Sequence, residues 1–355
     1  MSTHNNHTNI DLGPVMVDVE GLCLQRHEIE RLKNPLVGAV ILFARNYQDP
    51  NQLSELCRQI HEVREQPLLI AIDHEGGRVQ RCRSEGFTPL PAMRDLGALW
   101  DRDPDAALAL AHEVGYILAA ELRACGVDFS FTPVLDLDYG ASEVIGNRAF
   151  HRAPEIVAKL SEALIAGLAE AGMAACGKHF PGHGFVEADS HVAIPVDERE
   201  FDEIWQEDVQ PYVALGHLKL PSVMPAHVIY KKVDAMPAGF SRFWIQTVLR
   251  ERMDYQGMVF SDDLTMEGAS VVGGILDRAE AAFAAGCDMV LVCNRPDLAD
   301  ELLAGLKHQS TAESLQRLQN LMPKEAFMNW QQLHNEARYL NARELLERAL
   351  TKRSA

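Results

Sequence analysis

Eight short apolar segments recur along the chain, and most of them are followed by a longer segment with helical periodicity. The apolar segments span residues 14–19, 37–43, 67–72, 127–135, 174–180, 222–227, 257–261 and 288–293. They are apolar almost throughout rather than at alternate positions. This pattern is typical of parallel strands that are covered on both faces. We therefore predict eight buried strands.

The segments between these strands are amphipathic. Their apolar residues recur at i, i+3, i+4 and i+7, which predicts helices over residues 51–64, 105–123, 155–171, 200–215, 241–253 and 277–285. Strands that alternate with helices in this way favour a single (β/α)8 TIM barrel of the α/β class over a doubly wound open sheet. Because periodicity alone does not show that a sheet closes, the closed barrel is an expectation that depends on the structure.

The strand pattern ends after Arg295, and only helical sequence follows, with a break near Pro323. We expect residues 1–310 to form the catalytic barrel and residues 311–355 to form a C-terminal helical extension that packs on its outside. Neither a glycine-serine linker nor a repeat separates the two parts, so a second independent domain is not indicated.

The excess of acidic over basic residues argues against some classes of binding partner. The chain has 33 Lys and Arg against 51 Asp and Glu, a formal net charge of −18. Nucleic acids and anionic membranes bind through basic surfaces, so we expect neither as a partner. The first ten residues are polar, and no apolar run is long enough to span a bilayer. The seven cysteines are scattered and form no C-x-x-C pair, which argues against disulfides and a zinc knuckle and favours a cytoplasmic location.

Polar residues follow the predicted strands at their carboxyl ends. These residues are Asp73, Asp136, Asp138, Lys178, His179, His227, Asp262, Asn294 and Arg295. In a barrel of parallel strands the carboxyl ends meet at one mouth, where the working residues of such enzymes project. A charged group at the end of a buried strand needs either a partner or a chemical task. The sequence therefore predicts a functional site at this mouth.

The segment from Lys178 to His191 holds three histidines and an aspartate within a short distance. A metal site is disfavoured there, because Lys178 would repel a cation. Asp189 lies two residues before His191. A carboxylate beside an imidazole raises its pKa and fixes its tautomer, which makes His191 a candidate acid and base near neutral pH.

Two adjacent aspartates, Asp262 and Asp263, end the seventh predicted strand. Only one of them can face the barrel axis, so the other is expected to cap or pair elsewhere. The mouth then combines one carboxylate, an acid/base histidine and cationic donors such as Lys178, Arg81 and Arg148. Glycosyl transfer requires such a set, because its oxocarbenium-like transition state needs a nucleophilic carboxylate and a proton donor.

Five motifs occur together in the order that one enzyme family shows. They read IDHEGGRVQR at residues 72–81, GNRAF at 146–150, KHFPGHG at 178–184, DSH at 189–191 and SDDL at 261–264. In these motifs the chain resembles the bacterial branch of glycoside hydrolase family 3, over nearly the whole predicted barrel. His74 departs from the glutamine that many relatives have at this position, and it lies between two matched residues.

The resemblance implies roles for individual residues. It implies that Asp262 is the nucleophile, His191 the general acid/base and Asp189 the carboxylate paired with it. The positions implied to bind the terminal sugar are Asp73, Arg81, Arg148, Lys178 and His179. The implied activity is that of an exo-acting, retaining β-N-acetylglucosaminidase without metal or cofactor. Its implied substrates are muropeptide fragments or N-acetylglucosamine oligosaccharides in the cytoplasm.

Two other functions remain open on the sequence. A neutral histidine would not repel an incoming anion, so the same site could take phosphate in place of water and act as a phosphorylase. A sugar-binding barrel without turnover would need the same hydrogen-bond donors but no nucleophile. The presence of Asp262 together with the Asp189 and His191 pair favours an enzyme over this binding protein.

Overall fold

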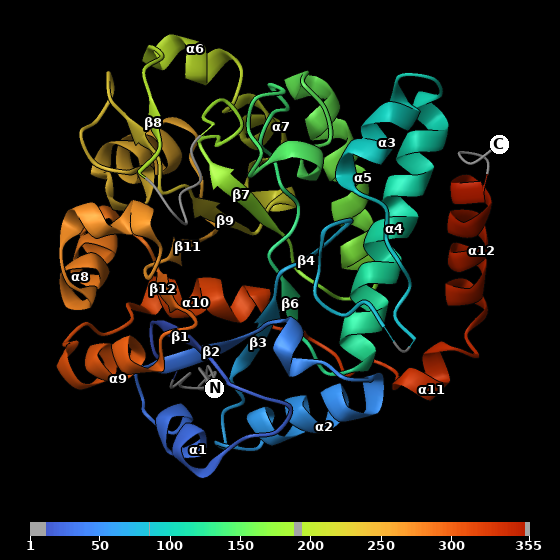
Figure 1. Ribbon diagram of the computed structural model, residues 1–355, viewed down its shortest axis with the longest axis horizontal. Helices are drawn as coiled ribbons and strands as arrows, with labels where there is room; N and C mark the ends of the chain where they lie inside the picture. The colour runs from blue at the N-terminus through green and yellow to red at the C-terminus, as the bar shows by residue number, and fades with distance from the viewer. Residues whose placement is uncertain (1–11, 85, 188–193, 352–355) are drawn as a thin grey trace, which may run out of the picture.

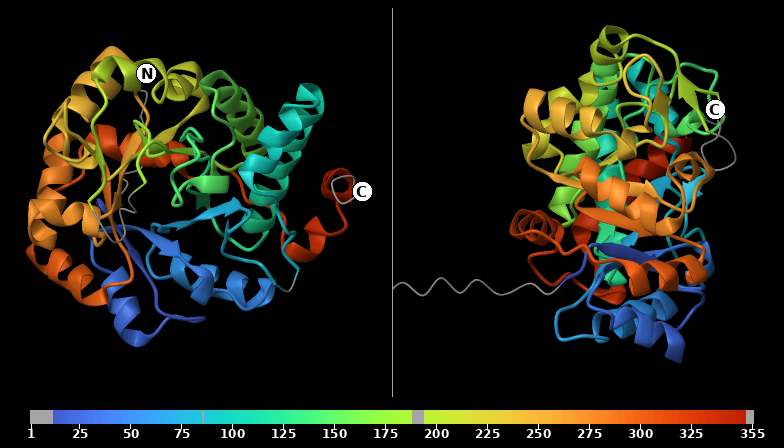
Figure 2. Two further views of the ribbon diagram at one scale, coloured as in Figure 1. Left: turned by 45° about the horizontal axis from the view of Figure 1, so that its top comes forward. Right: turned by 90° about the vertical axis from the view of Figure 1, so that its left-hand side faces the viewer.

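The computed structural model describes residues 12–84, 86–187 and 194–351, and it shows eight parallel strands inside a ring of helices (Figures 1 and 2). The strands are β1 (Val15–Asp18), β2 (Val37–Leu42), β3 (Leu69–Ile72), β6 (Phe129–Ser130), β7 (Cys176–Phe180), β9 (Ser222–Pro225), β11 (Met258–Asp263) and β12 (Met289–Val292). Their hydrogen-bonded order is β6-β3-β2-β1-β12-β11-β9-β7, so each strand lies beside its neighbours in chain order.

The barrel closes between β6 and β7. Val134 forms a parallel bridge with Lys178, and the N–H of Leu135 donates to the Lys178 carbonyl at 2.7 Å. The predicted (β/α)8 barrel is therefore confirmed. The predicted strand 127–135 is wrong in its length, because only Phe129–Ser130 is regular. Pro133 has no N–H to donate to a ladder, so the strand cannot continue through it.

A helix follows each barrel strand. These helices are α1 (Arg26–Leu32), α2 (Pro50–His61), α4 (Pro104–Ala124), α5 (Pro154–Glu170), α7 (Gln210–Lys219), η4 (Phe243–Arg252), α8 (Ile275–Ala285) and α9 (Pro296–Gly305), with the shorter α3 (Met93–Trp100) and α6 (Phe201–Gln206) before α4 and α7. The predicted single helix over 200–215 is wrong, since it divides into α6 and α7. Pro211 explains the break, because a proline is tolerated in the first turn of a helix but not in its interior.

Aromatic rings fill the barrel interior beneath the mouth. Phe131 lies edge-on to both Phe129 and Phe260, with ring centroids 5.1 Å and 5.2 Å apart, and all three rings are fully buried. Such edge-to-face packing holds large side chains in fixed orientations. The strand ends that carry the polar residues therefore stand on a close-packed base.

The C-terminal end is helical, in three pieces: α10 (Ala312–Leu321), α11 (Trp330–Leu333) and α12 (Ala337–Thr351). In α10, Ser314 and Arg317 bind Asp288, which precedes β12. In Figure 1, α12 lies beside α4, and the Tyr339 hydroxyl donates to the Glu121 carboxylate of α4 at 2.5 Å. The division of the chain at residue 310 stays a prediction. Within the described ranges, no helix is long and apolar enough to cross a membrane.

His74, the residue that departs from the family motif, is fully buried beside Phe87. Neither ring nitrogen has a hydrogen-bond partner among the described residues. Burial, together with the nearby charges of Arg81 and Arg83, lowers the pKa of His74 to about 3. The imidazole is therefore neutral in the folded protein at every pH near neutrality.

This burial makes the fold sensitive to acid. The folded pKa of His74 lies below the unfolded value, so below about pH 6.5 only the unfolded chain takes up this proton. Between pH 7.5 and pH 5, His74 alone should lower the free energy of unfolding by about 2 kcal/mol. Urea unfolding across this range should show a weaker pH dependence for His74→Gln than for the wild type. Equal slopes for the two proteins would contradict the prediction.

Candidate active site

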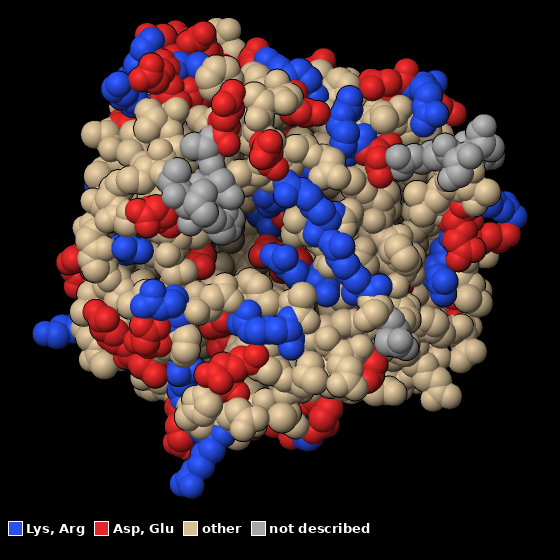
Figure 3. Space-filling model, in the orientation of Figure 1, with Lys and Arg blue, Asp and Glu red and all other residues tan. Residues whose placement is uncertain are grey.

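A cavity of about 520 Å³ opens at the carboxyl ends of the barrel strands. Figure 3 shows its mouth as a hollow near the middle of this face, with acidic and basic side chains together inside it. The site residues predicted from the sequence that line it are Asp73, Arg81, Arg148, Lys178, His179 and Asp262. They come from the ends of β3, β7 and β11, from the residue after β5 (Val79–Gln80), and from the short helix η2 (Gly146–Arg148).

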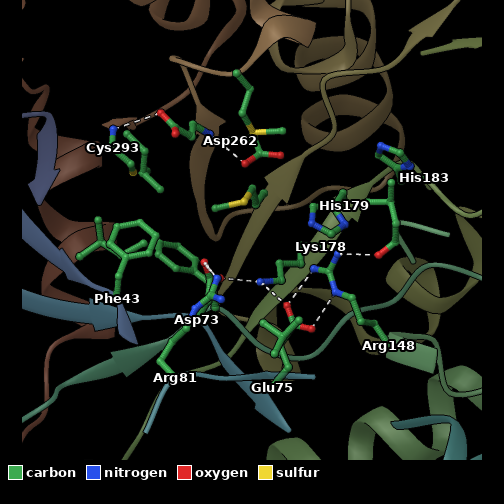
Figure 4. Close-up of a pocket in the computed structure, with 18 of the residues that line it drawn as sticks. Phe43, Asp73, Glu75, Arg81, Arg148, Lys178, His179, His183, Asp262 and Cys293 are labelled. Atoms are coloured by element: carbon green, nitrogen blue, oxygen red, sulfur yellow. Dashed lines mark hydrogen bonds and ion pairs between the residues drawn. The ribbon is translucent and has the colours of Figure 1, made fainter. Parts of the chain in front are cut away.

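One wall of the pocket is a cluster of buried ion pairs (Figure 4). The ammonium of Lys178 lies 2.7 Å from Asp73 Oδ1 and 2.7 Å from Glu75 Oε1. The Arg148 guanidinium donates to both oxygens of Glu75, at 2.8 Å and 2.9 Å. Arg81 lies 3.5 Å from Asp73 Oδ2. Glu75 thus joins the two cations, and its side chain is only 1% exposed.

Glu75 is a site residue that the sequence reasoning missed. It stands in the matched motif at residues 72–81, on β4 (His74–Gly76), but no role was assigned to it. The signal that would have found it was a second carboxylate two residues after Asp73, inside the same matched motif. Its partners come from distant parts of the chain, so the pairing itself is visible only in the folded protein.

The ion pairs decide the charge states in this wall. Burial alone raises the pKa values of Asp73 and Glu75, but Lys178, Arg81 and Arg148 outweigh burial and hold both pKa values below their ordinary range. Burial lowers the pKa of Lys178, yet the two carboxylates outweigh it and raise this pKa. All of these groups are therefore charged at neutral pH.

His179 is oriented by a buried carboxylate. Its Nδ1 lies 2.7 Å from Asp136 Oδ2, and Asp136 Oδ1 accepts from the backbone N–H groups of His179 and His183. Burial opposes the charge on Asp136, but His179 outweighs it and the pKa of Asp136 is lowered. An ionised Asp136 requires the proton on Nδ1, which leaves Nε2 of His179 for the pocket.

Asp262 and Asp263 differ in direction, as expected for adjacent acids at a strand end. Asp262 lines the pocket, and the N–H of Asp263 donates to its Oδ1 at 2.8 Å. The Asp263 carboxylate instead accepts hydrogen bonds from Thr265 and from the backbone of Cys293. Both aspartates line the pocket, but the Asp263 carboxylate is occupied by these bonds, so Asp262 is the candidate that faces a ligand.

The other strand-end residues have different surroundings. Asn294 lines the pocket, whereas Asp138 pairs with Arg94 and Arg295 pairs with Asp297 on the surface. Asp189 and His191 lie outside the described residues, so the structure does not place the predicted acid/base pair. Among the residues that are described, no group of three potential ligands could hold a metal ion.

Known proteins resemble this chain over most of its length. The family described as "Glycosyl hydrolase family 3 N terminal domain" matches residues 12–321. The chain is 67% identical to the Beta-hexosaminidase of Bordetella parapertussis over 333 residues, which is 94% of each chain. It is 62% identical to that of Aromatoleum aromaticum over 310 residues, which is 87% of each.

Solved structures extend the agreement to three dimensions. Native NagZ from Neisseria gonorrhoeae matches with a TM-score of 0.90 and 48% sequence identity, over 96% of this chain and 98% of that one. The same protein in complex with N-trifluoroacetyl-D-glucosamine matches equally well. The pocket described above thus lies in a barrel of the same shape as one that holds an acylated glucosamine.

The Glu75 ion pairs generate a prediction about stability. Glu75→Gln keeps the side-chain volume but leaves Lys178 and Arg148 facing each other across a neutral amide. Loss of one member of a buried charge cluster should lower the free energy of unfolding by about 3 kcal/mol. Urea denaturation at pH 7 measures the difference.

Glu143→Gln is the matched control for this substitution. Glu143 lines the same pocket, but its side chain is exposed and has no ion pair with any described residue. Its substitution should change the stability by less than about 0.5 kcal/mol. Equal effects of the two substitutions would show that the cluster does not support the fold.

Proposed function

The chain belongs to glycosyl hydrolase family 3 and is a glycoside hydrolase of the β-hexosaminidase type, and from this premise we propose that it is an exo-acting, retaining β-N-acetylglucosaminidase. The observation that carries the proposal is the pocket itself. One wall presents a carboxylate at the end of a rigid strand, and the other presents fixed cations and one oriented imidazole. A short pocket of this kind suits a single terminal sugar better than an open groove that would accept a long chain.

Asp262 is the proposed nucleophile. In a retaining mechanism its carboxylate attacks the anomeric carbon on the face opposite the leaving group and forms a covalent glycosyl-enzyme, which water then hydrolyses. The hydrogen bond from the Asp263 N–H orients the Asp262 carboxylate. His191, paired with Asp189, is the proposed acid that protonates the leaving oxygen and then the base that activates water. This role rests on the sequence motif.

The ion cluster and His179 are the proposed sugar-binding groups. Asp73 is ionised and therefore accepts hydrogen bonds from sugar hydroxyls, whereas Lys178 and Arg148 donate. Arg81 lines the pocket and lies 3.5 Å from Asp73 Oδ2, so its guanidinium is a further proposed donor to the ligand. Because their partners already fix these groups, little side-chain entropy is lost when the sugar binds.

The proposed natural substrates are cell-wall fragments in which N-acetylglucosamine is β-linked to 1,6-anhydro-N-acetylmuramic acid. Their cleavage in the cytoplasm would be a step of peptidoglycan recycling. The five family motifs and the β-hexosaminidase relatives support this proposal. The complex of Neisseria gonorrhoeae NagZ with N-trifluoroacetyl-D-glucosamine supports the choice of an acylated glucosamine as the terminal sugar.

An assay with two substrates tests the function. The wild type should hydrolyse an aryl β-N-acetylglucosaminide, and it should release single N-acetylglucosamine units from the non-reducing end of a chitin oligosaccharide. Asp262→Ala should lower the turnover by about 10³-fold or more, because the covalent route is lost. Circular dichroism should show that the variant keeps its fold.

Four outcomes would overturn parts of this proposal. Disaccharides as early products would contradict exo action by a short pocket. A sugar phosphate that forms in phosphate buffer would identify a phosphorylase. Sugar binding without any turnover by the wild type would identify a binding protein. An active Asp262→Ala variant would show that the nucleophile is a different residue.

The acid role of His191 predicts a dependence on the leaving group. His191→Ala should slow cleavage of a natural disaccharide far more than cleavage of a nitrophenyl glycoside, because a good leaving group needs little protonation. The ratio of kcat/KM values for the two substrates measures the effect. Equal slowing of both substrates would count against His191 as the acid.

A further inference from the structure

Asp263, the residue after the proposed nucleophile, has each of its polar groups hydrogen-bonded. Its Oδ1 accepts from the N–H of Thr265 at 2.9 Å and from the N–H of Cys293 at 3.1 Å. Its Oδ2 accepts from the Thr265 hydroxyl at 2.7 Å. Its own N–H donates to Asp262 Oδ1. The side chain thus ties the turn after β11 to the end of β12.

These bonds stand where the regular ladder between the two strands is interrupted. The register of β11 against β12 shifts between Phe260 and Asp263. Beyond the shift, the Asp263 carboxylate takes the N–H of Cys293, and the Thr265 hydroxyl lies 3.1 Å from the Cys293 carbonyl. Beyond the shift, these side-chain bonds therefore add to the backbone pairing of Asp263 with Leu291 at the level of the nucleophile.

A buried histidine, His227, holds the backbone carbonyl of Asp263. Nε2 of His227 lies 3.1 Å from the Asp263 carbonyl, so this nitrogen carries the proton and donates it. The His227 ring is fully buried and stacks on Phe240, with centroids 5.2 Å apart and planes 11° from parallel. The Asp263 carbonyl is thus held by the segment after β9, and the Asp263 side chain is held by the end of β12.

We propose that Asp263 is a positioning residue for the Asp262 nucleophile: by tying β11 to β12 it holds the peptide N–H that orients the Asp262 carboxylate. This inference rests on the proposed function. Nucleophilic attack requires near-aligned approach, and a displacement of about 1 Å can cost about 100-fold in rate. If Asp263 moves, its N–H no longer points at the Asp262 carboxylate in the required direction.

The hydrogen bonds of the Asp263 side chain depend on its geometry and not on a negative charge. Burial raises the pKa of Asp263 to about 7, so the network must hold with the carboxyl group in either protonation state. An asparagine keeps the same bonds. Its oxygen accepts from the two N–H groups, and its amide donates to the Thr265 hydroxyl, which then donates to the Cys293 carbonyl. Alanine keeps none of them.

The test compares Asp263→Ala with Asp263→Asn. Alanine should lower kcat on an aryl β-N-acetylglucosaminide by about 100-fold, while the Kd of N-acetylglucosamine, measured by calorimetry, changes by less than about twofold. The sugar-binding groups come from other strands, so ground-state binding should survive. Asparagine should restore most of kcat. Thr265→Val removes one donor to Asp263 and should lower kcat by about 10-fold. It replaces the alanine variant in the test if that variant does not fold.

Asp288→Asn is the matched control. Asp288 also ties β12 to β11, since it accepts from the N–H of Val259, but it does so at the end of the barrel away from the pocket. It is also paired with Arg250 and Arg317, so its substitution should lower the melting temperature. The kcat should stay unchanged. A loss of kcat here would mean that any weakening of these strands slows the enzyme, and would overturn the specific role of Asp263.

Other outcomes are equally decisive. Wild-type turnover by Asp263→Ala would overturn the inference, as would an asparagine variant as slow as alanine, or a Kd that weakens in proportion to kcat. The proposed function fails separately, if the wild type does not cleave the substrate or if Asp262→Ala remains active. An active wild type and an inactive Asp262→Ala, together with a fully active Asp263→Ala, would refute only the inference.

Discussion

Lys178 joins the closure of the barrel to the charge of the pocket. Its backbone pairs with Val134 and Leu135 at the seam between β6 and β7. Its side chain, 3% exposed, holds Asp73 and Glu75 at 2.7 Å each. The residue that completes the ring of strands therefore also places the central cation of the site. A change in the seam would move the ammonium relative to both carboxylates, so the fold and the site depend on the same few hydrogen bonds.

Burial of the ion cluster costs free energy of folding, and a bound sugar can offset part of this cost. Charges that leave water are stabilised only when partners replace their hydration. Lys178, Arg148 and Glu75 satisfy one another, but the pocket side of Asp73 and Arg81 is left for a polar ligand. A sugar with several hydroxyls and an amide supplies donors and acceptors to such groups at once. The arrangement thus trades some stability of the empty protein for fixed hydrogen-bonding directions toward the ligand.

The sequence predicts the fold well and the site in part, and the differences have physical causes. Continuous apolar runs located the eight strands, and the strand-end rule placed Asp73, Lys178 and Asp262 at one mouth. Pro133 shortened one predicted strand, and Pro211 divided one predicted helix. The pattern of apolar residues missed both effects, because it does not show where a backbone N–H is absent. The role of Glu75 could not be read from its neighbours, because its partners lie about 70 and 100 residues away.

The two proposed catalytic groups, Asp262 and His191, belong to parts of the chain whose described residues are held in different ways. Asp262 stands on β11, braced by β12 and His227. The segment with Asp189 and His191 leaves β7 through residues that are themselves anchored: the His183 N–H binds Asp136, and the Tyr230 hydroxyl donates to the Gly182 carbonyl at 2.7 Å.

On the far side of that segment, Arg199 binds Asp197 and Asp208 and stacks over Phe185, 4.0 Å from the ring centroid. Phe185 precedes the segment and Asp197 follows it, so this arginine joins its two flanks. A retaining mechanism needs its nucleophile and its acid at a set separation. For the proposed mechanism, the strand of Asp262 and the two flanks of residues 188–193 are therefore held by different contacts: β12 and His227 hold the strand, whereas Asp136, Tyr230 and Arg199 hold the flanks.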